Sequence, residues 1–438
     1  MRLRPDPLWT TLVAAGLLAA GLRAEAPAMF RGDAAHAGVF DSAPPTLASV
    51  AWTVRTGAKV LGSPVVSGDA VFVGGSDHRL RCLELKSGAE RWSFRAGGPI
   101  ACAPAVAGGR VIFTCLDGQV RALEPATGKV AWAFQTEGER RFSAPGIHGL
   151  MPRTEVMPDP FDLFLSSPTV QDGAVFVGSG DGHVYALDLA SGALRWKVRT
   201  GNVVHASPAV AQGRVFVGSF DGVFYALEAA TGKVLWRHQT GLDPDTHNQQ
   251  GIVSSACVAE GRVFFGCRDG HFYALDAAKG TLLWSHDNRK GWVIASPAVA
   301  QGRVYFPTSD GQRFKVLEAA TGKTLVDRPM SAVSFSSPAL VGNRILVGSS
   351  DGLLHLLDRE TGGTVATYAT EGHRANRAKY LDEKGQMIGK ALYPDRTLEG
   401  AIIGLDRMFS LGSILSSPVV AEGLVIVGSA DGSVLALR

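Results

Sequence analysis

The chain has 438 residues, of which 46% are hydrophobic and 19% are charged, and its formal net charge is +3. These apolar side chains can fill a large core, and the small net charge, with both signs scattered along the sequence, excludes a nucleic-acid-binding protein. Two or three domains would be usual for this length, but an internal repeat accounts for nearly all of the chain.

Residues 1–24 have the features of a secretory signal peptide. Arg2 and Arg4 precede an apolar run that ends in small residues at Ala24 and Ala26. These features predict that the segment is cleaved off and that the mature protein is secreted, to the periplasm, without a membrane span. A retained N-terminal anchor helix is the alternative. Residues 25–47 form a leader segment before the repeats.

Eight copies of one sequence unit follow the leader. The unit is clearest from Ser207 to Trp236, where alternating β-branched and aromatic residues are separated by Gly, Asp-Gly and Thr-Gly-Lys turns. Such runs predict four short antiparallel strands in each unit. In all eight copies the Asp of the second turn lies 13 positions after the residue that opens the unit, which is usually Pro. Four-stranded units of about 40 residues are typical of β-propeller blades.

The two ends of the chain complement each other. The eighth copy stops at the end of its third strand, at Arg438, whereas Trp52 lies in a fourth-strand sequence with no earlier strands before it. Residues 50–55 are therefore predicted to pair with residues 433–437 and to close the ring without an open sheet edge. The sequence thus predicts an all-β, eight-bladed propeller of four-stranded antiparallel blades over residues 48–438.

Six tryptophans recur at one position of the unit, at the fourth strand. Large aromatic side chains repeated at one blade position are expected to form the cores between blades, so we assign them a structural role. They are Trp52, Trp92, Trp132, Trp196, Trp236 and Trp284.

The chain has five cysteines, an odd number that argues against a disulfide framework. One pair is nevertheless placed for a bond. If Gly108 and Gly109 form the first turn of the second blade, the strand register sets Cys102 directly opposite Cys115, with Cα atoms about 4.5 Å apart. A disulfide between these two residues is therefore predicted.

Three insertions interrupt the repeat, at residues 137–163, 241–251 and 370–413. All three follow a fourth strand, and because strands alternate in direction they should crowd one face of the ring, where propellers often carry their function. No catalytic residue and no metal site is predicted. The residues of this face that are candidates for binding a ligand or partner are Lys59, Asn202, His205, His247, Arg289 and Trp292.

The segments 122–132 and 226–236, with looser copies at 186–196 and 274–284, resemble the tryptophan-docking motif of pyrroloquinoline quinone (PQQ) repeat propellers. That resemblance covers residues 48–438 and implies two classes of function. Quinoprotein dehydrogenases use the ring to hold PQQ and Ca²⁺, whereas non-catalytic members, such as the periplasmic scaffold of the outer-membrane β-barrel assembly machine, bind proteins. The chain lacks the adjacent Cys-Cys pair and the haem-binding motif found in many of the enzymes.

These observations favour a non-catalytic propeller without a cofactor, which binds a protein or an extended polymer of the cell envelope on the face that carries the insertions. We expect it to be a monomer. A PQQ- and Ca²⁺-dependent dehydrogenase acting on an alcohol or aldose is the alternative, because the fold alone does not choose between the two classes.

Overall fold

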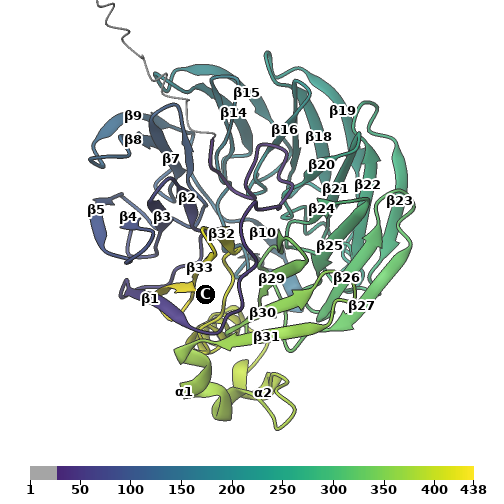
Figure 1. Ribbon diagram of the computed structural model, residues 1–438. Coiled ribbons are helices and arrows are strands. Elements are labelled where there is room, and N and C mark those ends of the chain that lie inside the picture. The colour runs from purple at the N-terminus through teal and green to yellow at the C-terminus, as the bar shows by residue number, and fades with distance from the viewer. Residues whose placement is uncertain (1–26) are drawn as a thin grey trace, which may run out of the picture.

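The computed structural model describes residues 27–438, which form a ring of eight four-stranded antiparallel sheets (Figure 1). The all-β, eight-bladed propeller predicted from the repeat is therefore confirmed. The predicted signal peptide lies within residues 1–26, outside the described residues. No helix from residue 27 onward is long and apolar enough to cross a bilayer.

Each blade runs from an inner strand at the channel to an outer strand at the rim. From the inside outward, blade one consists of β2 (Val65–Ser67), β3 (Ala70–Gly74), β4 (Arg79–Glu84) and β5 (Glu90–Arg95), and blade two of β6 (Ala105–Ala107), β7 (Arg110–Thr114), β8 (Gln119–Leu123) and β9 (Val130–Gln135). Blade three consists of β12 (Thr169–Gln171), β13 (Ala174–Gly178), β14 (His183–Asp188) and β15 (Leu194–Arg199). Blade four consists of β16 (Ala209–Ala211), β17 (Arg214–Gly218), β18 (Val223–Glu228) and β19 (Val234–Gln239). Blade five consists of β20 (Cys257–Ala259), β21 (Arg262–Gly266), β22 (His271–Asp276) and β23 (Leu282–Asp287), and blade six of β24 (Ala298–Ala300), β25 (Arg303–Pro307), β26 (Arg313–Glu318) and β27 (Thr324–Pro329). Blade seven consists of β28 (Ala339–Val341), β29 (Arg344–Gly348), β30 (Leu353–Asp358) and β31 (Thr364–Ala369). Blade eight consists of β32 (Val419–Ala421), β33 (Leu424–Gly428), β34 (Ser433–Leu437) and β1 (Val50–Arg55).

The ring closes as the sequence predicts. Strand β1 pairs antiparallel with β34, with Trp52 opposite Ala436 and Arg55 opposite Ser433. The first strand of the chain thereby becomes the outer strand of the last blade, and the two ends of the propeller are joined by backbone hydrogen bonds within one sheet.

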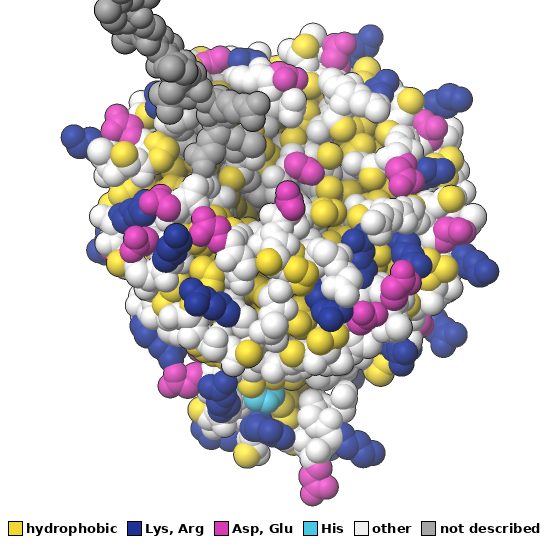
Figure 2. Space-filling view, in the orientation of Figure 1, with side chains coloured by type: hydrophobic (Ala, Val, Ile, Leu, Met, Phe, Trp, Pro, Cys, Tyr) yellow, Lys and Arg dark blue, Asp and Glu magenta, His cyan; other side chains and the backbone are white. Residues whose placement is uncertain are grey.

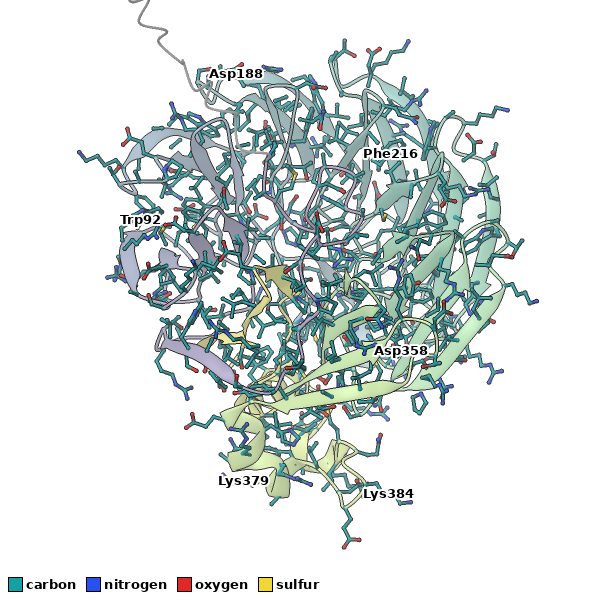
Figure 3. The ribbon with its side chains drawn as sticks, in the orientation of Figure 1. Trp92, Asp188, Phe216, Asp358, Lys379 and Lys384 are labelled. Carbon is teal, nitrogen blue, oxygen red and sulfur yellow. The ribbon has the colours of Figure 1, made fainter. Side chains whose placement is uncertain are left out.

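The blade tryptophans join neighbouring blades. The ring of Trp132 is almost fully buried, and its Nε1 donates a 2.9 Å hydrogen bond to the carbonyl of Leu189 in the next blade. A Cβ added to Gly192 would lie 2.6 Å from that ring, so only glycine allows the next turn to approach so closely. The other five make the same Nε1-to-carbonyl bond to the blade that follows. Trp92, labelled in Figure 3, shows their position at the outer edge of the ring.

A ring of serine hydroxyls joins the inner strands around the channel. The backbone N–H of Ser167 donates to the Oγ of Ser207, and the same 2.8–3.1 Å bond recurs from blade to blade through Ser255, Ser296, Ser337 and Ser417 to Ser63. Ala103 donates to Ser167 in this way but has no hydroxyl of its own. The chain of bonds therefore has one gap, between the first and second blades.

The leader closes one end of the channel. It crosses the front of the ring as the dark purple segment in Figure 1, and its backbone hydrogen bonds reach the inner strands of five blades, at Val106, Val210, Val258, Val299 and Leu340. Two buried side chains hold it there. Arg31 donates to the carbonyl of Pro297, and the His36 ring lies 3.2 Å from both the Ala256 carbonyl and the Thr169 hydroxyl. Burial, together with the smaller effect of nearby Arg31, lowers the pKa of His36 to about 3, so the ring is neutral.

The insertions meet on the opposite face. They contain β10 (Ser143–Pro145), the 3-10 helix η1 (Ile147–Gly149), β11 (Val156–Pro158), α1 (Glu371–Tyr380), α2 (Gly389–Leu392) and α3 (Leu398–Ser410). Phe142 and Ile147 of the first insertion pack with Leu405 and Met408 of α3 in one apolar cluster over the channel mouth. We call this cluster the cap.

Figure 2 shows charged side chains of both signs interspersed around the outer edge of the leader face. Figure 3 shows Lys379 and Lys384 at the far end of the third insertion, where they project away from the ring.

All five cysteines are free in the structure. The predicted register is present, since Ala107 pairs with Arg110 and Ala105 with Ile112. The thiols of Cys102 and Cys115 nevertheless donate to different carbonyls, those of Thr114 and Gly98. The disulfide between them is not formed here, and its formation in an oxidising compartment stays a prediction.

Candidate functional site

The central channel is closed at both ends and has little free space. Its cavity has a volume of about 50 Å³, and it is lined by the serine ring, by Phe30 of the leader and by Phe164 and Leu165, which directly follow the first insertion. A space of this size holds only a few water molecules. The channel is therefore part of the core rather than a ligand-binding site.

His205, a predicted binding residue, lies buried beneath the first insertion rather than at an open mouth. Its Nδ1 lies 2.6 Å from Asp162 and its Nε2 lies 2.7 Å from Glu139, and the side chains of all three are at most 7% exposed. Burial alone lowers the pKa of His205, but the two carboxylates outweigh it and raise the pKa to about 10. The ring is therefore a cation that ties the first insertion to the joint before blade four.

A second buried charge network lies beside it. The guanidinium of Arg268 is fully buried and pairs with Asp159, which also accepts a 2.6 Å hydrogen bond from Nε2 of His148. Burial raises the pKa of Asp159, but Arg268 and His148 outweigh burial and hold the pKa well below its usual value. Arg268 also lies over the ring of Trp292, 5.5 Å from its centroid. The network thus links the first insertion to the turn of blade five.

Trp292, another predicted binding residue, contributes to the wall of a large open pocket. Its Nε1 donates a 2.8 Å hydrogen bond to Asp243 of the second insertion, and its backbone N–H donates to Asp310. The pocket has a volume of about 710 Å³ and lies among all three insertions. We call it the insertion pocket; its walls include His148, Arg153, Phe161, Asp243, Asp245, Trp292, Asp310, Phe335, Tyr393, Asp395, Arg396 and Met408.

The other predicted residues lie apart from this pocket. Lys59 pairs with Asp406 of α3 and covers the ring of Phe409, so it holds the cap to blade one. The side-chain oxygen of Asn202 accepts the N–H of Val203 beside it. His247 and Arg289 are exposed, and both have left-handed backbone conformations.

Sequence reasoning missed Arg268, although the repeat contains the signal. The residue before the turn Asp is small or apolar in seven units, among them Ser76, Ser309 and Ala430, but it is arginine at position 268. An arginine at a position that faces the channel mouth indicates a buried charge pair. Its partner, Asp159, lies in an insertion without repeat spacing, so the pair itself was not predictable.

The family of the chain follows from a comparison of its sequence with family models. The model described as "Outer membrane protein assembly factor BamB" matches residues 45–148, 154–256 and 245–385. The chain belongs to this BamB family. No curated protein matches the chain.

Solved structures similar to this BamB-family chain include both classes implied by the sequence. BamB from Moraxella catarrhalis is 17% identical, with a TM-score of 0.61 over 89% of this chain and 97% of its own. A quinohemoprotein alcohol dehydrogenase from Comamonas testosteroni is 13% identical, with a TM-score of 0.67 over 93% of this chain and 79% of its own. The computationally designed protein Ika8 is 16% identical, with a TM-score of 0.62 over 88% of this chain and 97% of its own. At these identities the similarity shows the fold alone.

PQQ and Ca²⁺ do not fit the residues present. PQQ is a tricyclic tricarboxylate, far too large for the channel cavity of about 50 Å³. The insertion pocket is large enough, but its wall has four aspartates and only two arginines, the reverse of what a trianion needs. Within residues 27–438, no three His, Cys, Asp or Glu side chains come together as a metal site requires.

Proposed function

We propose that the chain is a non-catalytic, protein-binding propeller of the bacterial periplasm that holds its partner on the face with the insertions. The partner class is a protein of outer-membrane assembly, by analogy with the description of its family. We propose that it acts as a monomer and without a cofactor.

The observation that carries this proposal is the apolar surface of the insertions. Val156 of the first insertion is 64% exposed, Leu242 of the second is 55% exposed, and Ile402 of the third is 48% exposed. Each of the three insertions that meet on this face thus exposes a large apolar side chain, and exposed apolar side chains gathered on one face are typical of interaction sites on soluble proteins. The exposed leucines and valines of the outer strands, in contrast, are distributed over seven of the eight blades, one to a blade except for Leu282 and Leu283 on β23.

Point substitutions test this proposal better than removal of the third insertion. Deleting residues 372–412 would uncover the cap, because Leu405 and Met408 of α3 are buried in it. Val156→Glu and Leu242→Glu place a charge on the proposed interface without disturbing a buried residue. Leu282→Glu on the outer strand β23, where Leu282 is 49% exposed, is the matched control.

The measurement is co-purification of an outer-membrane assembly protein with the tagged mature chain from an envelope extract. We expect each interface variant to lower the amount captured at least tenfold, which corresponds to about 1.4 kcal/mol of binding free energy, while the control captures as much as the unaltered chain. Equal capture by all three variants would contradict the proposal. Stoichiometric binding of added PQQ, with reduction of a dye by an alcohol or aldose, would favour the dehydrogenase alternative.

A further inference from the structure

One joint between neighbouring blades lacks the tryptophan that fills six others. Val326 stands at the tryptophan position of β27, so an isopropyl group lies between blades six and seven in place of an indole. A groove of about 380 Å³ is present at this joint, which is within the range of about 300–1,000 Å³ typical of ligand pockets. We call it the rim groove; its walls include Phe314, Arg328, His355, Leu357, Gly362 and Thr364.

The six tryptophan joints show what this position accepts. At each of them the indole Nε1 donates to a backbone carbonyl of the next blade. The ring also packs on the glycine three residues after that carbonyl. Trp284, for example, bonds to the Ala319 carbonyl at 3.1 Å and lies so close to Gly322 that an added Cβ would be 2.6 Å from the ring. A carbonyl acceptor and a glycine at this spacing therefore form the indole site of a joint.

Blade seven keeps the two parts of an indole site. Arg359 supplies the equivalent carbonyl, and Gly362 is the equivalent glycine. A Cβ added to Gly362 would meet Val326 and the stem of Arg328 rather than an aromatic ring. The N–H of Arg359 bonds to the Asn343 carbonyl, but no group of the described residues donates to the Arg359 carbonyl itself. The acceptor that takes an indole N–H at six other joints thus has no donor here.

The described chain places no segment from outside blades six and seven in this joint. At the next joint Ala366 replaces the tryptophan, and Leu47 of the leader is buried in the apolar cluster that Ala366 joins. The cluster between blades six and seven, in contrast, consists of residues of those two blades and their connection. Phe314 and Leu357 on the groove wall are at most 5% exposed, whereas Thr364 is exposed. The rim groove therefore has an apolar interior that opens to solvent.

The charge on the groove wall is positive. The wall has no Asp or Glu, and exposed Arg328 pairs with no carboxylate of the described residues. The neighbouring carboxylate of Asp327 pairs with Arg313 instead. A guanidinium in this position can stack on an aromatic ring that enters the groove and can pair with a carboxylate beside that ring. The groove is therefore complementary to an aromatic side chain in an acidic segment.

We propose that the rim groove binds a tryptophan side chain from an extended segment of another protein, with the indole Nε1 donating to the Arg359 carbonyl and an acidic neighbour of the tryptophan paired with Arg328. The bound indole takes the place that the chain's own tryptophans take at six joints. This inference goes beyond the proposed function, because it assigns a second docking surface, on the outer rim, to which none of the three insertions contributes.

Blocked tetrapeptides of sequence Gly-Asp-Trp-Gly test this inference on the intact mature chain by calorimetry. Alanine in place of the tryptophan should lower the affinity at least tenfold, because the apolar contact and the hydrogen bond are both lost. A methyl group on the indole nitrogen should lower it about fivefold, because Nε1 can then no longer donate. Lysine in place of the aspartate should also lower it about fivefold, because it faces Arg328.

Variants of the chain place the binding in the groove. Val326→Trp fills the joint from within, so it should raise the denaturation midpoint and lower the affinity for the tryptophan peptide at least tenfold. Arg328→Glu changes an exposed residue and remains informative if Val326→Trp does not fold; it should make the lysine peptide bind more tightly than the aspartate peptide. The matched control is Arg95→Glu, at an exposed arginine of β5 in a blade that has its tryptophan, and it should change neither affinity.

Equal binding of the tryptophan, methylated and alanine peptides, or undiminished binding by folded Val326→Trp, would overturn the inference. Dimers that the tryptophan peptide separates in sedimentation would assign the groove to a second copy of the chain and would overturn it as well. Leu242→Glu on the insertion face should leave peptide binding unchanged, so this inference and the proposed function fail separately.

Discussion

The buried imidazolium of His205 gives the sharpest prediction for stability. Replacing His205 with Gln leaves the carboxylates of Glu139 and Asp162 in a site where all three side chains are at most 7% exposed. A histidine pKa raised from 6.5 to about 10 corresponds to about 5 kcal/mol of unfolding free energy. This agrees with the 3–5 kcal/mol typical of breaking a buried ion pair. We therefore expect a loss of about 3–5 kcal/mol.

The effect should depend on pH in a defined direction. Because the pKa is higher in the folded chain than in the unfolded one, the contribution of His205 is present in full below pH 6.5 and is lost as the pH rises toward 10. The difference in unfolding free energy between the unaltered chain and His205→Gln should shrink by about 1.4 kcal/mol per pH unit across this window.

Denaturant unfolding at pH 7, 8, 9 and 10 measures this difference. Limited proteolysis adds a local readout, since the variant should be cut within residues 137–163, which Glu139 and Asp162 tie down. His247→Gln changes an exposed histidine of the same face and should have no such effect. A difference that stays constant from pH 7 to 10, or a loss below about 1 kcal/mol at pH 7, would refute the charged state assigned to His205.

Three further outcomes follow from the joints between blades. Trp132→Ala should lower the unfolding free energy by about 3–5 kcal/mol, because a buried ring and the bond to Leu189 are both lost; a smaller loss in denaturant unfolding would contradict its role. Ala103→Ser should raise the unfolding free energy by about 0.5–1.5 kcal/mol, because the new hydroxyl can accept the Ser63 N–H and fill the gap in the serine ring; a lower denaturation midpoint would argue against it. Thiol counting on the unfolded, non-reduced mature chain should give three free thiols if Cys102 and Cys115 are joined, and a count of five would exclude the bond.

The propeller scaffold could be predicted from the repeat because the constant spacing of the repeat residues arises from contacts that recur in every blade. The 13-residue interval fixes the first two turns, and the incomplete eighth unit together with Trp52 fixes the closure of the ring. The serine ring was equally accessible, since serine precedes the opening position in seven of the eight units and Ala103 interrupts the series. These features could be predicted from the sequence because the residues that form each of them recur at a constant spacing along the chain.

The site was less predictable because its contacts have no constant spacing. His205 and Trp292 stood out as rim residues, but their partners Asp162 and Asp243 belong to insertions that occur once. The way these insertions fold over the channel decides that His205 is buried whereas Trp292 contributes to an open pocket. The sequence was therefore sufficient to predict which face carries the site. The position of the pocket depends on how the three insertions pack against one another, and only the structure shows that packing.

The path of the leader has a consequence for the order in which the chain is made. Its hydrogen-bond partners lie as far along the chain as Leu340, and the Oγ of Ser42 accepts the N–H of Gly423 in blade eight. During synthesis, residues 27–49 and β1 emerge long before the last blade and must wait for it before their partners exist. Chains that stop before β34 can build most blades and still leave Trp52 and its strand without a sheet to join. Docking of the leader therefore requires that the eighth blade has been made.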